Sequence, residues 1–337
     1  MYNNIIISKA NLINNIEQAK HSNPNSKICV MVKANAYGVG VREVVSVVDD
    51  YVDCYGVACF FEAKKLREIT DKEILIVAPS DDYRDCVEYN IQISCHSIAD
   101  ARRIKALNLP IKVHIKINTG MNRYGISSIG EFKLVVRLLR SSRAQIVGVY
   151  THFATDDEFV DEQMNRFLSV VKTTDAMLHV DNSAVSEARN HNLDMVRLGY
   201  NIYIQDLHGF KPVVRIKSTI VQIHRIKKGQ MVGYNRRFVS DGKMRVAVIP
   251  IGYADGLDMR YIGGTIFFNG CNCKILNICM DCFMIDITEA GGVVGDEIFV
   301  IDKYNPIKKF AQMLNSSEYE VMTKFANMRA DRIIVDY

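Results

Sequence analysis

A lysine ends the first strongly apolar run of the chain. Residues 27–33 read KICVMVK, and Lys33 is followed at once by the turn sequence ANAYG. A lysine at the end of a buried strand is costly to desolvate. Burial and neighbouring cations would lower its pKa and make it a nucleophile toward an aldehyde. Lys33 is therefore a candidate for Schiff-base chemistry.

Further residues that could do chemistry follow later apolar runs. They are Lys116 and Arg123 in KINTGMNRYG, His152 in YTHFAT, Asn182 and Ser183 after MLHVD, and Arg197 in VRLGY. Each alone has an ordinary structural explanation, because a lysine at a strand end is usually solvated and a single histidine usually packs in a core. Their repeated occurrence at the ends of apolar runs favours one common site.

The elements that must position these residues alternate along the first two-thirds of the chain. The expected strands are residues 27–33, 54–60, 73–78, 91–95, 111–118, 145–152, 177–181 and 194–199. The helical patterns between them include residues 61–69, 98–107, 131–142 and 162–171. This alternation predicts a (β/α)8 TIM-type barrel over residues 1–212, in which catalytic groups lie at the C-terminal ends of the strands. An open doubly wound sheet is the alternative, but no G-x-G-x-x-G follows the first strand.

The pattern changes near residue 213. Alternating, glycine-punctuated stretches such as RVAVIPIGYADG and TIFFNGCNCKILNICMD predict a separate, smaller β domain over residues 213–337. Cys271, Cys273, Cys279 and Cys282 superficially resemble a zinc site. Their strand-like surroundings favour buried small apolar residues instead, so we expect no metal.

Composition narrows the class of protein. The chain has 337 residues, 24% of them charged, and a net charge of +4 with the two signs interspersed. Without a basic stripe or a long apolar segment, neither nucleic acid nor a membrane is an expected partner. Nine cysteines and no recognisable secretory leader predict reduced thiols and a cytoplasmic location.

The chemistry of the candidate site leaves two classes open. A Schiff-base lysine fits a barrel aldolase or an enzyme that binds pyridoxal phosphate. Ser183 and the turn at residues 197–200 can present a hydroxyl and backbone N–H groups to a phosphate. Arg197 then remains as a cation for a ring nitrogen, so pyridoxal phosphate accounts for more of these features.

Eight motifs in order carry a resemblance to a known family. They are VMVKANAYG, KINTGMNRYG, YTHFAT, NSA, VRLG, VGYNRRF, GYADG and ICMD, within residues 30–282, and VGDEIFVI extends the match. The sequence resembles the alanine racemases, which are fold-type III pyridoxal phosphate enzymes with an N-terminal barrel and a C-terminal β domain. The resemblance implies a homodimer with active sites at the subunit interface and a small amino acid as substrate.

The resemblance also implies roles. Lys33 would hold pyridoxal 5'-phosphate covalently and act as the base on the D side, and Tyr234, from the partner subunit of a dimer, would be the base on the L side. The other implied cofactor contacts are Tyr37, Ser183, Gly199 and Tyr200 at the phosphate, Arg197 at the ring nitrogen and His152 beside the ring. Implied substrate contacts are Arg123, the backbone N–H of Met280, and Tyr253 at the entrance. Lys116 occupies the position that is carbamylated in many members.

Departures from the family pattern keep alternatives open. Asn118 replaces a common aspartate, and Asn327 or Met328 stands near the place of a tyrosine that narrows the pocket. A serine or broad-specificity racemase is therefore an alternative. Arg197 argues against a decarboxylase, while residues 213–337 and Tyr234 argue against a non-enzymatic pyridoxal phosphate-binding protein. A role in supplying D-alanine to peptidoglycan and a catabolic role are both compatible with the sequence.

Overall fold

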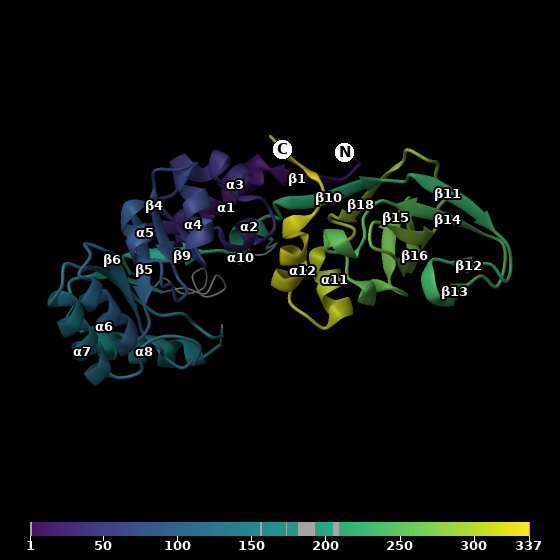
Figure 1. Ribbon diagram of the computed structural model, residues 1–337. Helices are drawn as coiled ribbons and strands as arrows, with labels where there is room; N and C mark the ends of the chain where they lie inside the picture. The colour runs from purple at the N-terminus through teal and green to yellow at the C-terminus, as the bar shows by residue number, and fades with distance from the viewer. Residues whose placement is uncertain (1, 156, 173, 181–192, 205–208, 337) are drawn as a thin grey trace. The chain divides into compact units, whose positions relative to one another are not determined.

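The computed structural model describes residues 2–155, 157–172, 174–180, 193–204 and 209–336 (Figure 1). The chain divides into two compact units. One contains Leu12–Ala36 and Val44–Lys211, and the other contains Met1–Asn11, Tyr37–Glu43 and Pro212–Tyr337. The last segment starts at Pro212, one residue before the expected boundary at residue 213. The expectation placed residues 1–11 and 37–43 with the barrel, whereas their contacts group them with the β-rich unit.

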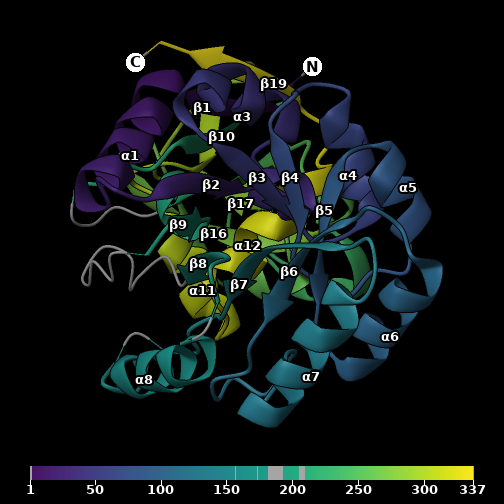
Figure 2. The same ribbon diagram turned by 90° about the vertical axis from the view of Figure 1, so that its left-hand side faces the viewer.

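The first unit is a closed barrel of parallel strands (Figure 2). Within the described residues its strands are β2 (Lys27–Met31), β3 (Cys54–Val57), β4 (Glu73–Ile76), β5 (Ile91–Cys95), β6 (Lys112–Lys116), β7 (Gln145–Tyr150), β8 (Met177–Val180) and β9 (Met195–Leu198). β9 pairs with β2 and closes the ring. The eight expected strands are confirmed. Most of their residues are buried, because helices cover the outer faces of the strands.

Helices follow the strands along the chain. They are α1 (Lys9–Ser22), α3 (Val41–Val48), α4 (Phe60–Arg67), α5 (Tyr83–Glu88), α6 (Ile98–Leu107), α7 (Ile129–Arg140), α8 (Phe159–Val171) and α10 (Tyr200–Tyr203). Figure 2 shows α4, α5, α6 and α7 on the outside of the barrel. Local sequence sets their ends: Ser97 caps α6 through the backbone N–H of Asp100, and Ser128 caps α7 through that of Glu131.

The β-rich unit contains two main sheets and a short ribbon. One sheet has the order β18 (Glu297–Ile301), β10 (Val214–Thr219), β1 (Asn4–Ser8) and β19 (Asp331–Val335). The other is antiparallel, in the order β11 (Gln222–Ile226), β14 (Met244–Ile249), β17 (Phe283–Asp286), β16 (Cys271–Ile278) and β15 (Thr265–Phe268). The ribbon pairs β12 (Met231–Val232) with β13 (Phe238–Val239). The expected β domain is thus confirmed.

Several elements of this unit are not evident from the local sequence pattern. The N-terminal strand β1 pairs with β10 and with β19, both more than 200 residues away along the chain. Helices α11 (Ile307–Leu314) and α12 (Glu318–Lys324) also belong to it. Of the four clustered cysteines only Cys273 is buried, and the other three are partly exposed. None of the helices within the described ranges has the length and apolar character needed to cross a lipid bilayer.

Candidate active site

Lys33 follows β2 and begins a turn of unusual hand. The next four residues all have positive φ, with values of 52° for Ala34, 54° for Asn35, 53° for Ala36 and 56° for Tyr37. Each L-residue in this left-handed conformation costs about 1–2 kcal/mol. Strained backbone of this kind is concentrated at functional sites, where the surrounding structure enforces it. This strained backbone makes the segment after Lys33 a candidate part of a functional site.

A carboxylate secures the end of this strand. Glu62, in α4, accepts a 2.7 Å hydrogen bond from the backbone N–H of Ala34 and a 2.8 Å bond from that of Ala58. The N–H of Ala36 donates to the carbonyl of Val32. Glu62 therefore fixes the backbone on the C-terminal side of Lys33, and sequence analysis did not identify it.

Cations gather at the C-terminal ends of the barrel strands. The pKa of Lys116, which is only 4% exposed, is lowered to about 7 by burial and then by the charges of Arg123, Arg197 and Lys33. The pKa of His152 is lowered well below its usual value by burial and the same cations, together with Lys116. The structure thus brings together five predicted site residues, as expected from their positions at the ends of strands: Lys33, Lys116, Arg123, His152 and Arg197.

Aromatic and polar side chains of the barrel interior support Arg197. Its guanidinium carbon lies 4.7 Å from the centre of the Tyr150 ring, and its Nη2 donates a 2.8 Å bond to the carbonyl of Thr151. Its Nη1 bonds to Nδ1 of His179, whose ring stacks on Tyr150 with centroids 4.8 Å apart. Sequence analysis missed Tyr150 and His179. The available signal was period-two alternation, because Tyr150 ends β7 two residues before His152.

The predicted phosphate contacts are only partly described. Gly199 immediately precedes α10, which starts at Tyr200, and the start of a helix is where backbone N–H groups can bind a phosphate. Tyr37 groups with the β-rich unit, where its buried ring lies 6.2 Å from that of Tyr319. Ser183 and Asn182 lie outside the described residues.

Tyr234 lies in the β-rich unit, on the loop between β12 and β13, and is 71% exposed. The buried amide of Asn277 donates to the carbonyls of Val232 and Tyr234 at 3.0 and 3.2 Å. Gly233 has a φ of 68°, and a Cβ there would come within 2.5 Å of the Asn277 amide nitrogen. The loop can bend around Asn277 because residue 233 has no side chain.

We expect Asn277→Asp to destabilise the protein by about 2–3 kcal/mol, because it replaces a two-fold donor with an oxygen facing two carbonyls. Urea unfolding measures the change in the free energy of unfolding. Asn272→Asp is the matched control, since Asn272 is exposed on the same strand, and its effect should stay within about 0.5 kcal/mol. Equal effects of the two substitutions would show that Asn277 does not hold the loop.

Tyr253 and Met280 belong to one cluster of turns. The backbone N–H of Tyr253 donates to the carbonyl of Cys279, and that of Ala254 to the carbonyl of Met280. Arg329 ties the turns together, donating to both carboxylate oxygens of Asp255 and pairing with Asp281 at 2.8 Å. The structure therefore brings the two predicted substrate contacts of this unit together.

Residues at the departures from the family pattern occupy different environments. Asn327 is exposed, whereas Met328 is buried. Asn118 organises its own loop, because its Oδ1 accepts from the backbone N–H groups of Gly120 and Asn122. Asn327 is therefore the residue whose side chain faces solvent near the position of the family's tyrosine.

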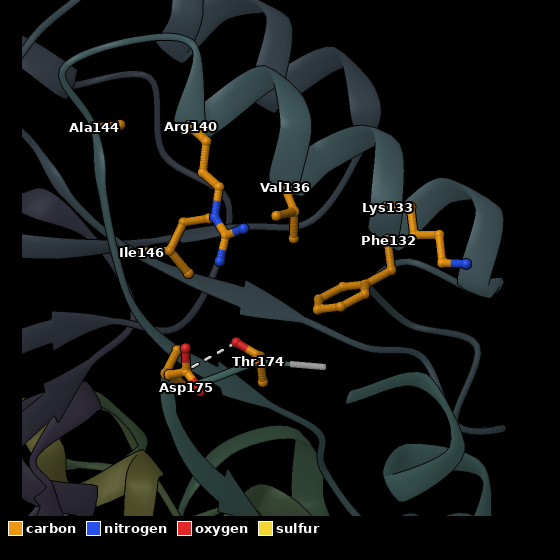
Figure 3. Close-up of a pocket in the computed structure, with 9 residues that line it drawn as sticks. Phe132, Lys133, Val136, Arg140, Ala144, Ile146, Thr174 and Asp175 are labelled. Carbon is orange, nitrogen blue, oxygen red and sulfur yellow. Dashed lines mark hydrogen bonds between the residues drawn. The ribbon is translucent and has the colours of Figure 1, made fainter. Parts of the chain in front are cut away.

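A cavity on the barrel wall is separate from these residues. Its volume is about 410 Å3, and Phe132, Val136, Ile146, Lys133 and Arg140 are among the residues lining it (Figure 3). It is lined by α7, the start of β7 and the residues just before β8. Among the predicted site residues that the structure describes, none lines it.

The barrel, the lysine after its first strand and the additional β-rich unit define a two-domain barrel enzyme. The family model for the N-terminal domain of alanine racemase matches residues 7–206, and that for the C-terminal domain matches residues 213–334. The chain therefore belongs to the alanine racemase family.

Individual relatives agree with this assignment. The chain is 34% identical over 371 residues to the alanine racemase of Treponema denticola, covering 98% of this chain and 97% of that protein. It is 31% identical over 365 residues to that of Pasteurella multocida, covering 98% and 97%. The crystal structure of alanine racemase from Bacillus anthracis with bound L-Ala-P has a TM-score of 0.92 at 26% identity, covering 99% of this chain and 95% of that one.

Proposed function

We propose that this protein is a pyridoxal phosphate-dependent racemase that interconverts L- and D-alanine. The observation that carries the proposal is Lys33, at the end of the first barrel strand, among Lys116, Arg123 and Arg197 in a chain of the alanine racemase family. Pure protein supplied with pyridoxal phosphate should abolish the optical rotation of L-alanine and form D-alanine. A protein that leaves L-alanine unchanged would refute it.

The residues present fit the cofactor. Burial, and then the charges of Arg123, Arg197 and Lys33, lower the pKa of Lys116, as expected where like charges lie near one another in a buried place. A phosphate and a substrate carboxylate would offset this positive charge. Lys33 would hold the cofactor covalently, Arg197 would face the ring nitrogen and His152 the ring, with Tyr37, Ser183, Gly199 and Tyr200 at the phosphate. When bound, pyridoxal phosphate acidifies the Cα–H of the amino acid.

The protein then has to move a proton on each face of the substrate. In the proposal Lys33 Nζ exchanges a proton with Cα on the D side, and Tyr234 Oη does so on the L side. A phenol ordinarily ionises only near pH 10, so a tyrosine acts as a base near neutrality only beside positive charge. Arg123 would supply that charge and also bind the substrate carboxylate, together with the backbone N–H of Met280. Tyr253 would line the entrance.

A homodimer completes the proposed site. Tyr234 is 71% exposed on the β-rich unit, so its phenol is available to a second molecule. In the proposal Tyr234 of the partner subunit faces Lys33 at the subunit interface. Mixing an inactive Lys33→Ala chain with an inactive Tyr234→Ala chain should restore activity, because one of the two sites in a mixed dimer has both bases.

Alanine is the proposed substrate, and serine is the alternative. Exposed Asn327 near the place of the family's tyrosine supports a wider pocket. A methyl group contributes only about 1–3 kcal/mol of discrimination. We expect kcat/KM for alanine to exceed that for serine. An equal or larger value for serine would overturn this choice of substrate.

We further propose that Lys116 is carbamylated. Carbamylation requires the neutral amine, and a pKa of about 7 leaves roughly half of Lys116 neutral at pH 7. The carbamate would be an anion beside Arg123. A carbamate signal in 13C NMR after incubation with 13C-bicarbonate, lost in Lys116→Met, would support the modification.

The same pKa predicts how stability depends on pH in CO2-free buffer. The pKa of Lys116 is about 7 in the folded protein and has a usual value of 10.5, so between these values the unfolded chain binds more protons. The free energy of unfolding should therefore rise with pH from 7 to 9, and this group alone contributes about 1.4 kcal/mol per pH unit at most. Urea titrations measure it. Lys116→Met should have a smaller slope, and parallel curves would contradict the lowered pKa.

A further inference from the structure

A chain of hydrogen bonds crosses the interior of the barrel. His114 Nδ1 lies 2.7 Å from His179 Nε2, and His114 Nε2 lies 2.6 Å from Gln92 Oε1. His179 Nδ1 in turn bonds to Arg197. We call Gln92, His114, His179 and Arg197 the lumen chain. All four are at most 5% exposed, and they come from four different strands.

The donors in the lumen chain can be assigned from one end. A guanidinium only donates, so His179 Nδ1 must accept, and a neutral His179 must carry its proton on Nε2. That proton is donated to His114 Nδ1, which places the proton of His114 on Nε2. The residue at the far end must then offer an acceptor. The Gln92 carbonyl oxygen does so, and the bonds from Arg197 to Gln92 all run in one direction.

We propose that Gln92 is a positioning residue, whose side-chain carbonyl fixes the tautomers of His114 and His179 and thereby holds Arg197 in place for the cofactor ring. The inference rests on the proposed function only for its kinetic consequence. Gln92 acts through three other side chains and lies toward the start of its strand, whereas Lys33 follows the end of its own.

The electrostatic surroundings keep both histidines neutral. Burial and the charge of Arg197 lower the pKa of His114 to about 3, and that of His179 falls well below its usual value for the same reasons and because of His114. Tyr150 stacks on His179, and Lys116 lies 5.5 Å from the Tyr150 ring centre. At the other end Gln92 and His114 line a cavity of about 10 Å3 with Lys27, Asp53, Cys54 and Glu73. The carboxylate residues Asp53 and Glu73 are at this end of the lumen chain.

The barrel wall makes room for the chain. Gly148 on β7 is the register partner of His114 on β6. A Cβ on Gly148 would lie 2.2 Å from His114 Nδ1, the atom that accepts from His179. Any other residue at position 148 would displace the imidazole. The absence of a side chain at this position is thus required for the bond between the two histidines.

Tautomers provide a readout that does not depend on activity. In the pyridoxal phosphate-loaded protein labelled with 15N-histidine, two-bond 1H–15N spectra distinguish Nδ1–H, Nε2–H and doubly protonated rings. His114 and His179, assigned through single His→Gln variants, should both be neutral Nε2–H tautomers at pH 7. A proton on Nδ1 of either ring would overturn the proposal.

Gln92→Glu tests the direction of the chain. The carboxylate still accepts from His114 Nε2, but its charge favours a second proton on His114 Nδ1. His179 Nε2 must then accept, which places the proton of His179 on Nδ1, where it opposes the Arg197 donor. We expect this change in the spectra, with kcat for alanine lowered about tenfold and KM changed less than about threefold. Gln92→Met, which removes the acceptor without adding charge, should release the tautomers and lower kcat less.

Leu75→Met is the matched control, because Leu75 is the register partner of Gln92 and packs at the same level of the barrel. It should change neither the spectra nor kcat. Unchanged tautomers in Gln92→Glu, or changed tautomers with kcat within about twofold of the parent, would overturn the positioning role. A parent protein that shows the expected tautomers but does not racemise alanine would refute the proposed function and leave the tautomer assignment standing.

Discussion

Lys33→Ala is expected to lower alanine racemisation by about a thousandfold or more, because it removes both the covalent attachment of the cofactor and one of the two bases. Lys33→Arg should lose as much, since a guanidinium keeps the positive charge but forms no Schiff base at neutral pH. Polarimetry with L-alanine measures both. The arginine variant therefore shows whether Lys33 is needed as a nucleophile or only for its positive charge.

The position of the cofactor can be read independently of rate. Borohydride reduction followed by peptide mass spectrometry should find pyridoxal phosphate on the peptide that contains Lys33. Lys27→Ala is the matched control, because Lys27 is exposed at the start of the same strand, and it should keep its activity and label. A label on another lysine, or activity retained without Lys33, would remove the basis of the proposed function.

The fold was readable from the sequence where local pattern determines structure. The run around Cys29 is apolar on both faces, as a strand under covering helices can be, and Val113 and Val149 alternate with residues of the barrel interior. Lysine, histidine and arginine at the ends of such runs then had to lie on one face of a closed barrel. That geometric rule placed Lys33, Lys116 and Arg197 together without any knowledge of their contacts.

The rest depends on contacts between residues distant in sequence. The sequence of β1 does not indicate that it pairs with β10 and β19. The residue types of Ala34, Asn35 and Ala36 do not predict a left-handed turn, as glycines would. Glu62, which holds that turn, is 28 residues from Ala34. The lumen chain has only a weak sequence signal: His114 lies two residues before Lys116, on the same face of one strand.

Tyr234→Phe is expected to slow strongly the exchange of the α-hydrogen of L-alanine with solvent while leaving that of D-alanine. The substitution keeps the ring and removes the hydroxyl, the proposed proton carrier on the L side, and loss of such a group costs about a hundredfold to ten-thousandfold. Racemisation needs both faces, so it should fall in both directions. Proton NMR in D2O measures exchange of each enantiomer separately.

The difference in exchange rate between L- and D-alanine tests whether Tyr234 is one of two bases. Lys33 remains in Tyr234→Phe and can still exchange the proton of D-alanine, so a two-base site loses one enantiomer's exchange and keeps the other's. A site with a single base, or a merely structural tyrosine, would slow both equally. Tyr304→Phe is the matched control, since Tyr304 is 55% exposed in the same unit. Equal loss for the two enantiomers in Tyr234→Phe would therefore remove Tyr234 from the chemistry even if racemisation itself were confirmed.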